Sequence, residues 1–289
     1  MRQESNSAFG LPPVLKDREF KRFSSVIYDE VGIKMPPAKK TLLEARLQKR
    51  LKALGIGTFE EYADYFFSAS GRQNELVHLI DVVTTNKTDF FREPAHFDFL
   101  VKKAIPQLIQ ERNSGFGSPL KVWSAGCSTG EEPYTLAMVL SEYAAHNPGF
   151  RSSILASDIC TEVLAKSRNA IYAEERTDPI PLNLKKKYLL KSRDKAKGLV
   201  RIVPGLRSMI KFMRLNFMED FPLTEQMDII FCRNVIIYFD KQTQSHLMMR
   251  FWKQLAPGGF LFLGHSETLN GINVPLTPII STVYRRIDK

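Results

Sequence analysis

The sequence predicts an α/β protein in which a nucleotide-binding, Rossmann-like parallel sheet follows an all-α N-terminal domain. Three observations predict this fold: a strand, a glycine loop and a helix in succession, two later apolar strands that end in polar residues, and helical periodicity without strands before residue 88. Strand, glycine loop and helix in this order form the first unit of a nucleotide-binding sheet. We therefore expect a helical domain over 1–88 and a ligand-binding domain over 89–289.

The N-terminal domain is expected to begin after a loose, polar stretch at residues 1–15 that contains prolines. One helix is predicted from Ala38 to Leu54, because Gly55 is the residue type that commonly ends a helix. Further helices are predicted at Phe59–Phe67 and Asn74–Val83. The apolar stripe of the first of these helices consists of Leu43, Leu47, Leu51 and Leu54.

A basic face is predicted on the same helix. Arg46, Lys49 and Arg50 are three and four positions apart, which places them together on one side of a helix. The charge is extended by Lys39, Lys40 and Lys52. Because the leucine stripe occupies another face, we expect these cations to point to solvent or to a partner.

The glycine loop narrows the class of ligand. Lys121–Ser124 is a short apolar strand, two glycines follow at positions 126 and 130, and Tyr134–Tyr143 is periodic like a helix. The spacing Gly-x-x-x-Gly is not that of dinucleotide or P-loop sites, and Glu131 and Glu132 begin the helix. Carboxylates there repel phosphate but suit a neutral or cationic ligand such as S-adenosylmethionine. The pattern leaves open an ordinary strand–turn–helix.

Two later strands place polar residues at the same edge of the sheet. Ser153–Asp158 ends in an acid that can accept hydrogen bonds from both hydroxyls of a ribose. The alternative, compatible with the first, is that Asp158 caps a helix beginning near Thr161. The buried strand that starts at Asp228 runs into Arg233 and Asn234. Ligands of open α/β sheets lie outside the carboxyl ends of the strands, where these residues fall.

The rest of the ligand-binding domain is expected to contain an insertion at about 183–210. Short strand-like pieces occur at Lys187–Leu190 and Gly198–Val203, and Pro204–Gly205 is typical of a turn. The sheet is then expected to resume with a strand at Ile210–Leu215. The last two strands, Phe260–Leu263 and about Ile280–Arg285, follow a predicted turn at Pro257–Gly259.

Composition is that of an ordinary globular protein, with 44% hydrophobic residues and no apolar run near the roughly 20 residues that span a membrane. The N-terminus lacks an apolar signal segment. Three cysteines, odd in number and far apart, fit a reducing cytoplasm and show no metal-binding spacing. The five histidines form no ligand pair in the sequence, so we expect no metal.

The net charge of +10 is concentrated between residues 183 and 215, which hold seven Lys and four Arg against one Asp. Charge this local favours an acidic partner, although a solvated basic face is the alternative.

Five motifs in register resemble the CheR-type chemotaxis receptor methyltransferases. They are Asn86–Glu93 (NKTDFFRE), Trp123–Tyr134 (WSAGCSTGEEPY), Ala156–Asp158 (ASD), Phe231–Val235 (FCRNV) with Tyr238–Asp240 (YFD), and Gly264–Glu267 (GHSE). The resemblance covers the chain from about Phe20 to Arg286. It implies a helical N-terminal domain, then a methyltransferase domain that carries a small antiparallel β-subdomain.

The resemblance implies transfer of a methyl group from S-adenosylmethionine to glutamate carboxylates on the cytoplasmic helices of methyl-accepting chemotaxis receptors, with S-adenosylhomocysteine as the product. It implies that Arg92 and Tyr238 are catalytic and face the point of transfer. Taken alone, Arg92 would be a surface ion pair and Tyr238 an aromatic at the edge of the core. The resemblance assigns contacts with the cofactor to Asn86, Thr88, Arg92, Glu132, Asp158, Asn216, Phe217, Cys232, Arg233 and Asn234. It also suggests that the receptor helices are acidic around the methylation sites, so we predict that the receptor docks on the basic helix through Arg46, Lys49, Arg50 and Lys52.

Two departures from the family pattern occur. Phe217 stands where relatives often carry leucine, and without the family it would be read as a core residue. The basic loop Lys191–Lys197 has a glycine only at its end, Gly198, whereas relatives that tether a receptor's C-terminal pentapeptide tend to have glycines there. This argues against pentapeptide tethering. We expect a monomer.

Two other functions remain alternatives. A nucleic-acid methyltransferase would suit the basic patch, but Arg233-Asn-Val is not the motif of amino-group DNA methyltransferases, and the chain has no catalytic Cys-Pro pair. A non-catalytic regulator that binds S-adenosylmethionine is opposed by the presence of Arg92, Asp158 and Tyr238.

Overall fold

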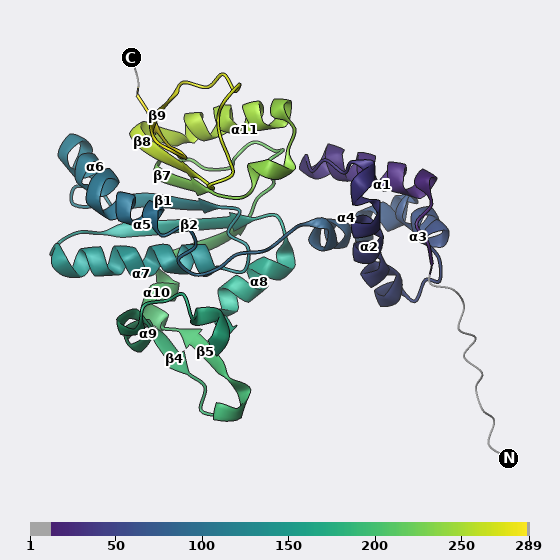
Figure 1. Cartoon of the computed structure of the whole chain (residues 1–289), viewed down its shortest axis with the longest axis horizontal. Helices are drawn as coiled ribbons and strands as arrows, with labels where there is room; N and C mark the ends of the chain where they lie inside the picture. The colour runs from purple at the N-terminus through teal and green to yellow at the C-terminus, as the bar shows by residue number, and fades with distance from the viewer. Residues whose placement is uncertain (1–12, 288–289) are drawn as a thin grey trace. The chain divides into compact units, whose positions relative to one another are not determined.

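The computed structural model describes residues 13–287, which form two compact units (Figure 1). The first unit comprises residues up to Glu30 and Lys34–Val83, and the second comprises Val31–Ile33 and the chain from Thr84 onward. The division therefore falls after Val83, whereas the sequence predicted a boundary at residue 88. A three-residue segment of the N-terminal region also belongs to the second unit.

The first unit is helical. Its elements are α1 (Asp17–Val31, whose last residue belongs to the second unit), the 3-10 turn η1 (Pro37–Lys39), α2 (Lys40–Leu54), α3 (Phe59–Phe66) and α4 (Ala69–Val83). As predicted, α2 ends where Gly55 adopts a left-handed φ of 68° and its N–H caps the last carbonyls. A capping box between Thr58 and Glu61 starts α3. The core contains stacked and edge-on aromatic rings, Phe23, Tyr62 and Phe66 among them.

Two expectations for this unit need correction. Residues 1–12 of the stretch expected to be loose lie outside the described residues, but Leu15 is fully buried and donates its N–H to Glu44. In the predicted leucine stripe, Leu43, Leu47 and Leu51 are buried, whereas Leu54 is 37% exposed because it stands at the end of α2.

The predicted basic face of α2 does not point wholly to solvent. Arg50 makes two hydrogen bonds, of 2.6 and 3.1 Å, to the buried carboxylate of Glu75 in α4. Arg46 donates to the carbonyl of Val83, at the end of α4. The expectation was wrong for these two arginines because α4 packs against the side of α2 that carries them. Lys49 and Lys52 remain exposed.

The second unit is built on a seven-stranded sheet in the order β6-β2-β1-β7-β8-β10-β9. The strands are β1 (Leu120–Ala125), β2 (Ser152–Asp158), β6 (Ile210–Arg214), β7 (Met227–Cys232), β8 (Leu255–Leu263), β9 (Leu276–Ile280) and β10 (Val283–Arg286). The first five in the spatial order pair in parallel, and the last two are antiparallel. The strand order reverses direction between β1 and β7, which is the place where open α/β sheets bind ligands.

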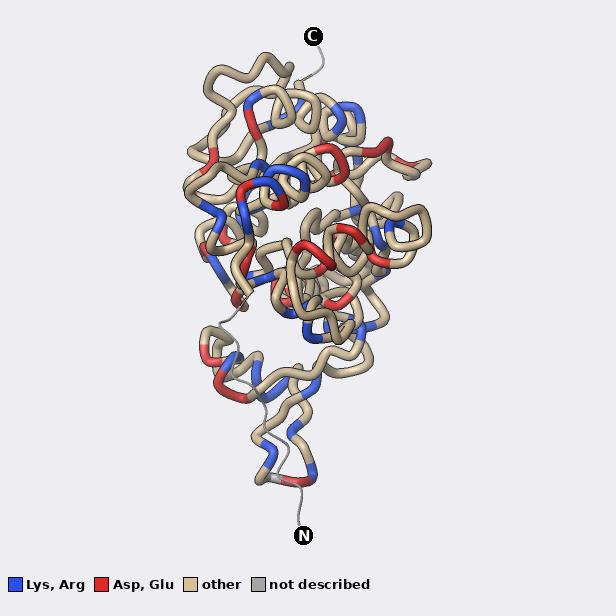
Figure 2. The backbone as a smooth tube through the Cα atoms, turned by 90° about the vertical axis from the view of Figure 1, so that its right-hand side faces the viewer, with Lys and Arg blue, Asp and Glu red and all other residues tan. Residues whose placement is uncertain are grey.

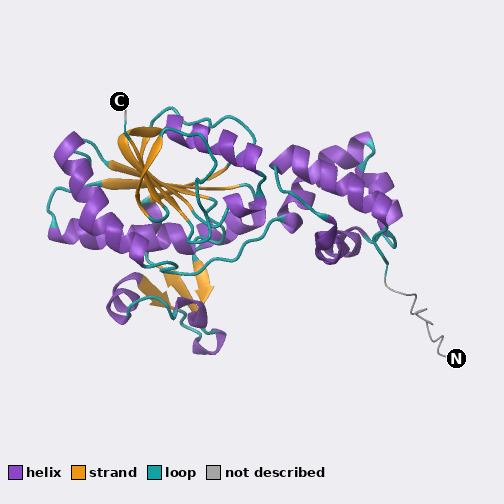
Figure 3. Ribbon diagram, turned by 45° about the horizontal axis from the view of Figure 1, so that its top comes forward, coloured by secondary structure: helices purple, strands orange, loops and turns teal. Residues whose placement is uncertain are grey.

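Helices cover both faces of this sheet (Figures 1 and 3). Val122 in β1 and Ile229 in β7 pack with the helices α5 (Ala95–Phe99), α6 (Ile105–Arg112) and α7 (Glu131–His146), and with the π-helical turn η2 (Leu100–Ala104) that joins α5 to α6. The next residues in these strands, Trp123 and Ile230, point to the other face, where α11 (Lys241–Gln254) lies. The alternation follows from the two-residue period of a strand, and it explains why nearly every residue of the central strands is apolar. The helix α8 (Thr161–Asn169) follows β2.

A second, three-stranded antiparallel sheet has the order β3-β5-β4, from β3 (Ile171–Ala173), β4 (Leu189–Lys191) and β5 (Leu199–Ile202). It is accompanied by η3 (Glu174–Thr177), α9 (Leu182–Tyr188), η4 (Lys195–Lys197) and α10 (Pro204–Ser208). The insertion was predicted to begin at residue 183, but its first strand, β3, begins at Ile171, so the insertion starts earlier than predicted. The predicted turn at Pro204 was wrong: the proline occupies the first turn of α10, where its missing N–H costs nothing.

Two further corrections concern the end of the chain. Pro257–Gly259 is not a turn but lies inside β8, at an irregularity in its pairing with β7; a Cβ on Gly259 would stand 2.9 Å from the Asp228 carbonyl oxygen. The strand predicted at 280–285 is instead a hairpin of β9 and β10, which turns at Thr282 with a φ of 65°. Within residues 13–287, no helix is both long enough and apolar enough to cross a bilayer.

Candidate functional site

A cavity of about 880 Å³ opens at the carboxyl ends of the parallel strands in the second unit. Its walls come from the loops that follow β1, β2, β6 and β7, and from the segment Thr84–Arg92. It is lined by Val31, Ile33, Thr84, Thr85, Asn86, Lys87, Thr88, Arg92, Gly126, Ser128, Glu132, Asp158, Ile159, Leu215, Asn216, Phe217, Arg233, Asn234, Val235, Tyr238 and Phe239.

The glycines after β1 are required by space and by backbone conformation. Gly126 has a φ of 85°, and a Cβ there would stand 2.6 Å from the Val235 side chain. Gly130 has a φ of 100° at the start of α7, and a Cβ would stand 2.8 Å from the Tyr172 hydroxyl. Only glycine adopts these angles without strain. The loop can therefore run close to the cavity.

Asp158 lies buried at the end of β2 and lines the cavity. Its carboxylate accepts hydrogen bonds from the N–H of Ser128, at 2.8 Å, and from the N–H of Cys160, at 3.0 Å. One oxygen thus fixes the glycine loop and the other orders the entry to α8. The two predicted roles, ligand contact and support of the helix start, are compatible in this geometry.

Both glutamates that begin α7 are paired with arginines. Arg176 lies 2.9 Å from Glu131, and Nε of Arg233 lies 2.7 Å from Glu132. These partners stand 45 and 101 residues away in the sequence, so the pairing was not part of the sequence-based expectation. Of the two, Glu132 lines the cavity and also accepts a hydrogen bond from Ser124.

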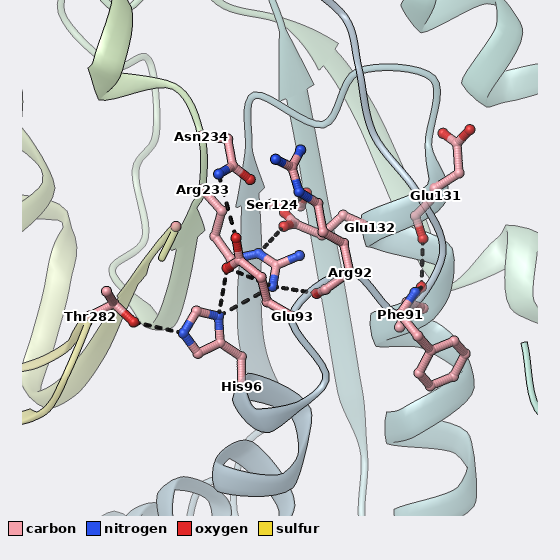
Figure 4. A network of polar contacts seen from close by, with 12 residues as sticks. Phe91, Arg92, Glu93, His96, Ser124, Glu131, Glu132, Arg233, Asn234 and Thr282 are labelled. Atoms are coloured by element: carbon pink, nitrogen blue, oxygen red, sulfur yellow. Dashed lines mark hydrogen bonds and ion pairs between the residues drawn. The ribbon is translucent and has the colours of Figure 1, made fainter. Parts of the chain in front are cut away.

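Arg233 is the centre of a buried polar network (Figure 4). Besides Glu132, its guanidinium reaches the carbonyl of Arg92 at 2.7 Å, Nδ1 of His96 at 3.2 Å and Glu93 at 3.5 Å. Burial and the neighbouring Arg233 lower the pKa of His96 to about 4, so the imidazole is neutral at pH 7. A neutral ring whose Nδ1 accepts from Arg233 carries its proton on Nε2 and donates it to Thr282, 2.8 Å away.

This network holds the segment that carries Arg92. The residues on either side, Phe91 and Glu93, have φ values of 52° and 58°. This left-handed backbone conformation costs free energy for residues other than glycine. The surrounding contacts maintain this conformation, and the Arg92 side chain lines the cavity and donates to the carbonyl of Lys87 at 3.1 Å. Strain of this kind is typical of functional sites.

Phe217 and Tyr238 complete the cavity on the side of α11. Phe217 is half-buried, packs edge-on against Trp123 and Phe251, and lines the cavity. It is therefore both a core residue and part of the cavity wall. Tyr238 ends the short 3-10 helix η5 (Ile236–Tyr238) that follows β7 and is half-buried at the cavity.

Nine of the ten residues expected to contact a cofactor line this one cavity, and Tyr238 joins them. The exception is Cys232, which is fully buried among the side chains that face α11 and does not line the cavity. Contact of Cys232 with the cofactor therefore stays a prediction that the lining of the cavity does not support.

Other residues of the site were not found from the sequence. Ser128 and Lys87 line the cavity, and His96 and Glu267 support it from behind. Glu267 belongs to one of the quoted motifs, but its hydrogen-bond partners are backbone N–H groups, and a sequence motif does not predict such partners.

The fold brings together the side chains of Glu93, His96 and His265, whose potential ligand atoms lie within 4.8 Å of one another. The sequence spacing did not predict this cluster. Its centre is not open to a metal ion, since the Arg233 guanidinium lies within 3.2 Å of His96 and 3.5 Å of Glu93. A divalent cation would have to displace a permanent cation that is also held by Glu132 and by the carbonyl of Arg92.

Figure 2 marks the Lys and Arg positions of the chain in blue and the Asp and Glu positions in red. The charge of the basic segment 183–215 is partly balanced in space, because three of its lysines form ion pairs with acids outside the segment. Lys185, Lys187 and Lys191 pair with acids that precede the segment: Asp178, Glu142 and Glu174. The remaining charge is still positive, but the full value of +10 is not presented to a partner.

Comparison with known proteins identifies the class. Residues 86–285 match the family model of the CheR methyltransferase S-adenosylmethionine-binding domain, and residues 18–84 match the CheR methyltransferase all-alpha domain. The chain is 42% identical to a chemotaxis protein methyltransferase of Borreliella burgdorferi, over 94% of this chain and 95% of the relative. It is 38% identical to chemotaxis protein methyltransferase 2 of Pseudomonas aeruginosa, over 92% of each chain, and 38% identical to the Escherichia coli chemotaxis protein methyltransferase, over 93% and 91%.

The match to the S-adenosylmethionine-binding family model, together with the glycine loop and the cavity at the reversal point of the sheet, identifies a methyltransferase that uses S-adenosylmethionine. Within that class, the chain belongs to the CheR methyltransferase family, over both its helical and its α/β unit. The predicted fold, cofactor and enzyme class are confirmed.

Proposed function

We propose that this protein methylates glutamate carboxylates on the cytoplasmic helices of chemotaxis receptors. The observation that carries the proposal is the arrangement of the cavity: the residues suited to S-adenosylmethionine and the two residues suited to an incoming carboxylate, Arg92 and Tyr238, line the same space. The related proteins are named chemotaxis methyltransferases, which supports a receptor as the substrate.

The charged and polar residues that line the cavity suit S-adenosylmethionine. Asp158 stands at the end of β2, where an acid accepts hydrogen bonds from ribose hydroxyls. Glu132, held by Arg233 and Ser124, offers a carboxylate to an ammonium or a sulfonium. Asn216 and Phe217, which follow β6 and line the cavity, are the residues that we propose for contact with the adenine. When bound, S-adenosylmethionine supplies an electrophilic methyl group on sulfur.

The substrate needs no base to remove a proton. A glutamate side chain has an ordinary pKa of about 4.3, so at neutral pH it is an anion and already nucleophilic. Attack on the methyl group neutralises a carboxylate and a sulfonium together. The protein must therefore align the carboxylate with the methyl group and keep water out, since a less polar site favours a less charged transition state.

Arg92 is the residue best placed to align the carboxylate. Its planar guanidinium can hold two carboxylate oxygens, and its backbone is fixed by the contact with Arg233. Tyr238 lines the same cavity, and a tyrosine hydroxyl there can donate to the carboxylate or contact the methyl group. These two roles are part of the proposal.

We further propose that the receptor docks on two exposed cations of α2, Lys49 and Lys52, and on the three-stranded sheet with its accompanying helices, residues 171–208, which we call the small-sheet subdomain. The loop between β4 and β5 contains Arg193 and has a glycine only at its end, Gly198, so we do not propose capture of a C-terminal pentapeptide there. The enzyme would act as a monomer in the cytoplasm.

Methyl transfer from labelled S-adenosylmethionine to receptor-containing membranes tests the proposal, with RNA and DNA as parallel acceptors. We expect label in the receptor that is released by mild base, as a methyl ester is. Label found only in nucleic acid would refute the proposal. Arg92→Ala should abolish the transfer, whereas the same change at the exposed Lys103 should leave it intact.

A further inference from the structure

The turn that follows β8 lies against the loop that follows β7. Glu267, in this turn, is only 4% exposed, and its carboxylate accepts four backbone hydrogen bonds. The donors are the N–H groups of Asn234 at 2.8 Å, Ile236 at 2.8 Å, Ile237 at 3.4 Å and Gly264 at 2.6 Å. One carboxylate thus joins the ends of two neighbouring parallel strands.

The loop that Glu267 holds forms one wall of the cavity. Residues 233–235, 238 and 239 all line it. The N–H groups of Ile236 and Ile237 belong to the first turn of η5, which has no capping side chain from its own preceding residue, and Tyr238 is the last residue of η5. Orphan N–H groups at a helix start need an acceptor, and Glu267 supplies it from another part of the chain.

The loop has little support for its conformation from its own sequence. Asn234 has a φ of 60°, in the left-handed region. Its backbone also passes so close to Gly264 that a Cβ on that glycine would stand 2.8 Å from the Asn234 nitrogen. Residues in such conformations persist when their surroundings over-determine them, and here the Glu267 carboxylate accepts from three N–H groups of the loop.

We propose that Glu267 is a positioning residue for methyl transfer, whose carboxylate holds η5 so that Tyr238 faces the cavity. The inference rests on the role proposed above for Tyr238. Both carboxylate oxygens are used, each by two N–H groups, so the site requires a carboxylate: an amide would turn its own NH₂ group toward two donors.

Glu267→Gln tests the inference in the full-length enzyme. We expect kcat for receptor methylation to fall at least tenfold. The matched control is Asp228→Asn, which alters a buried carboxylate at the opposite, amino end of β7, where it accepts from the N–H of Lys121 at 2.8 Å. This control should lower the unfolding temperature by a similar amount, yet change kcat by less than twofold.

A double-mutant cycle identifies the route of the effect. If Glu267 acts through Tyr238, Glu267→Gln should lower kcat much less in a Tyr238→Phe background than in the parent. Equal losses in both backgrounds would overturn the inference, as would a Glu267→Gln enzyme with parental kcat.

Amide hydrogen exchange provides a readout that needs no substrate, so it separates this inference from the proposed function. We expect the amides of Asn234, Ile236 and Ile237 to exchange faster in Glu267→Gln and at the parental rate in Asp228→Asn. Unchanged exchange in Glu267→Gln would overturn the inference even if the receptor is methylated. If the parent methylates no receptor, the proposed function fails, and faster exchange in Glu267→Gln still supports the positioning role.

Discussion

At the scale of single residues, the site depends on side chains that each hold a segment of backbone while facing the ligand. Asp158 holds the glycine loop, Arg233 holds the Arg92 segment, and Glu267 holds the loop that ends in Tyr238. In each case a charged group accepts from, or donates to, main-chain atoms of another loop. Substitution at these positions should therefore change geometry as well as charge.

Asp158→Asn should weaken the binding of S-adenosylmethionine and of S-adenosylhomocysteine by similar factors. The variant keeps the size of the side chain but loses an acceptor, and a hydrogen bond to a charged group contributes about 1.5–3 kcal/mol. We expect dissociation constants at least tenfold higher by calorimetric titration. Unchanged affinity in a folded variant would remove Asp158 from the cofactor site.

His96 should make the stability of the α/β unit depend on pH. Burial and Arg233, opposed by Glu93 and aided by His265, lower its pKa to about 4, against an ordinary value of 6.5. Between pH 4 and pH 6.5, the imidazole is therefore protonated in the unfolded chain and neutral in the folded protein. Stability from this residue is complete above pH 6.5 and is lost as the pH falls toward 4, by about 2 kcal/mol between pH 7.5 and 5.

Denaturant unfolding of His96→Gln at these two pH values tests this expectation. Both tryptophans, Trp123 and Trp252, lie in the second unit, so their fluorescence reports its unfolding alone. The variant should lose part of the parental pH dependence, and His246→Gln, at an exposed position of α11, should keep it. A parental pH dependence in His96→Gln would mean that the buried imidazole is not the group that titrates.

At the scale of elements, sequence patterns predicted those helices, strands and loops whose conformation depends on residues near one another in the sequence. The strand–glycine loop–helix unit, the end of α2 at Gly55 and the central strands are set by periodicity and by glycine conformation, and they were predicted. Elements that depend on distant contacts were not: Pro257 is accommodated inside β8 by an irregularity in its pairing with β7, and β3 exists because β5 pairs with it.

The candidate site divides in the same way. Residues at strand ends, such as Asp158 and Asn234, could be placed from topology alone, since parallel strands end at one edge. The pairing of Glu132 with Arg233, and the burial of Cys232 against α11, depend on which face each side chain occupies. A shift of one residue along a strand changes that face, and motif spacing does not resolve it.

The helix α2 shows the same limit and supplies a prediction. Arg50→Ala should destabilise the helical unit by about 3–5 kcal/mol, because it leaves the buried Glu75 carboxylate without its cation. Lys49→Ala, on the exposed side of the same helix, should cost less than about 0.5 kcal/mol. This unit contains neither tryptophan, so calorimetry and helical circular dichroism of the full chain are the measurements. Equal stability of the two variants would contradict a structural role for Arg50.

At the scale of the whole molecule, the net charge of +10 can act on a partner in two ways. A general excess of positive charge raises the rate of encounter with any acidic partner and is weakened by salt. A local arrangement of cations also sets the register in which the partner binds. Since several lysines of the small-sheet subdomain are paired with nearby acids, the exposed cations of α2 are the better candidates for a local effect.

Charge reversal at Lys49 and Lys52 separates these two effects. The residues are three positions apart on α2 and exposed, so Lys49→Glu/Lys52→Glu should spare the fold and the affinity for S-adenosylmethionine. We expect KM for the receptor to rise at least fivefold, with kcat within twofold of the parent. The control is Lys103→Glu/Lys253→Glu, which changes two exposed lysines of the other unit and alters the net charge by the same amount.

If KM rises equally in both double variants, only the general charge matters. If KM rises only in the α2 variant, the receptor docks on this helix. High salt should then raise KM of the parent enzyme as well, because the screening length falls to about 3 Å at 1 M. An unchanged KM in the α2 variant would assign docking to the small-sheet subdomain.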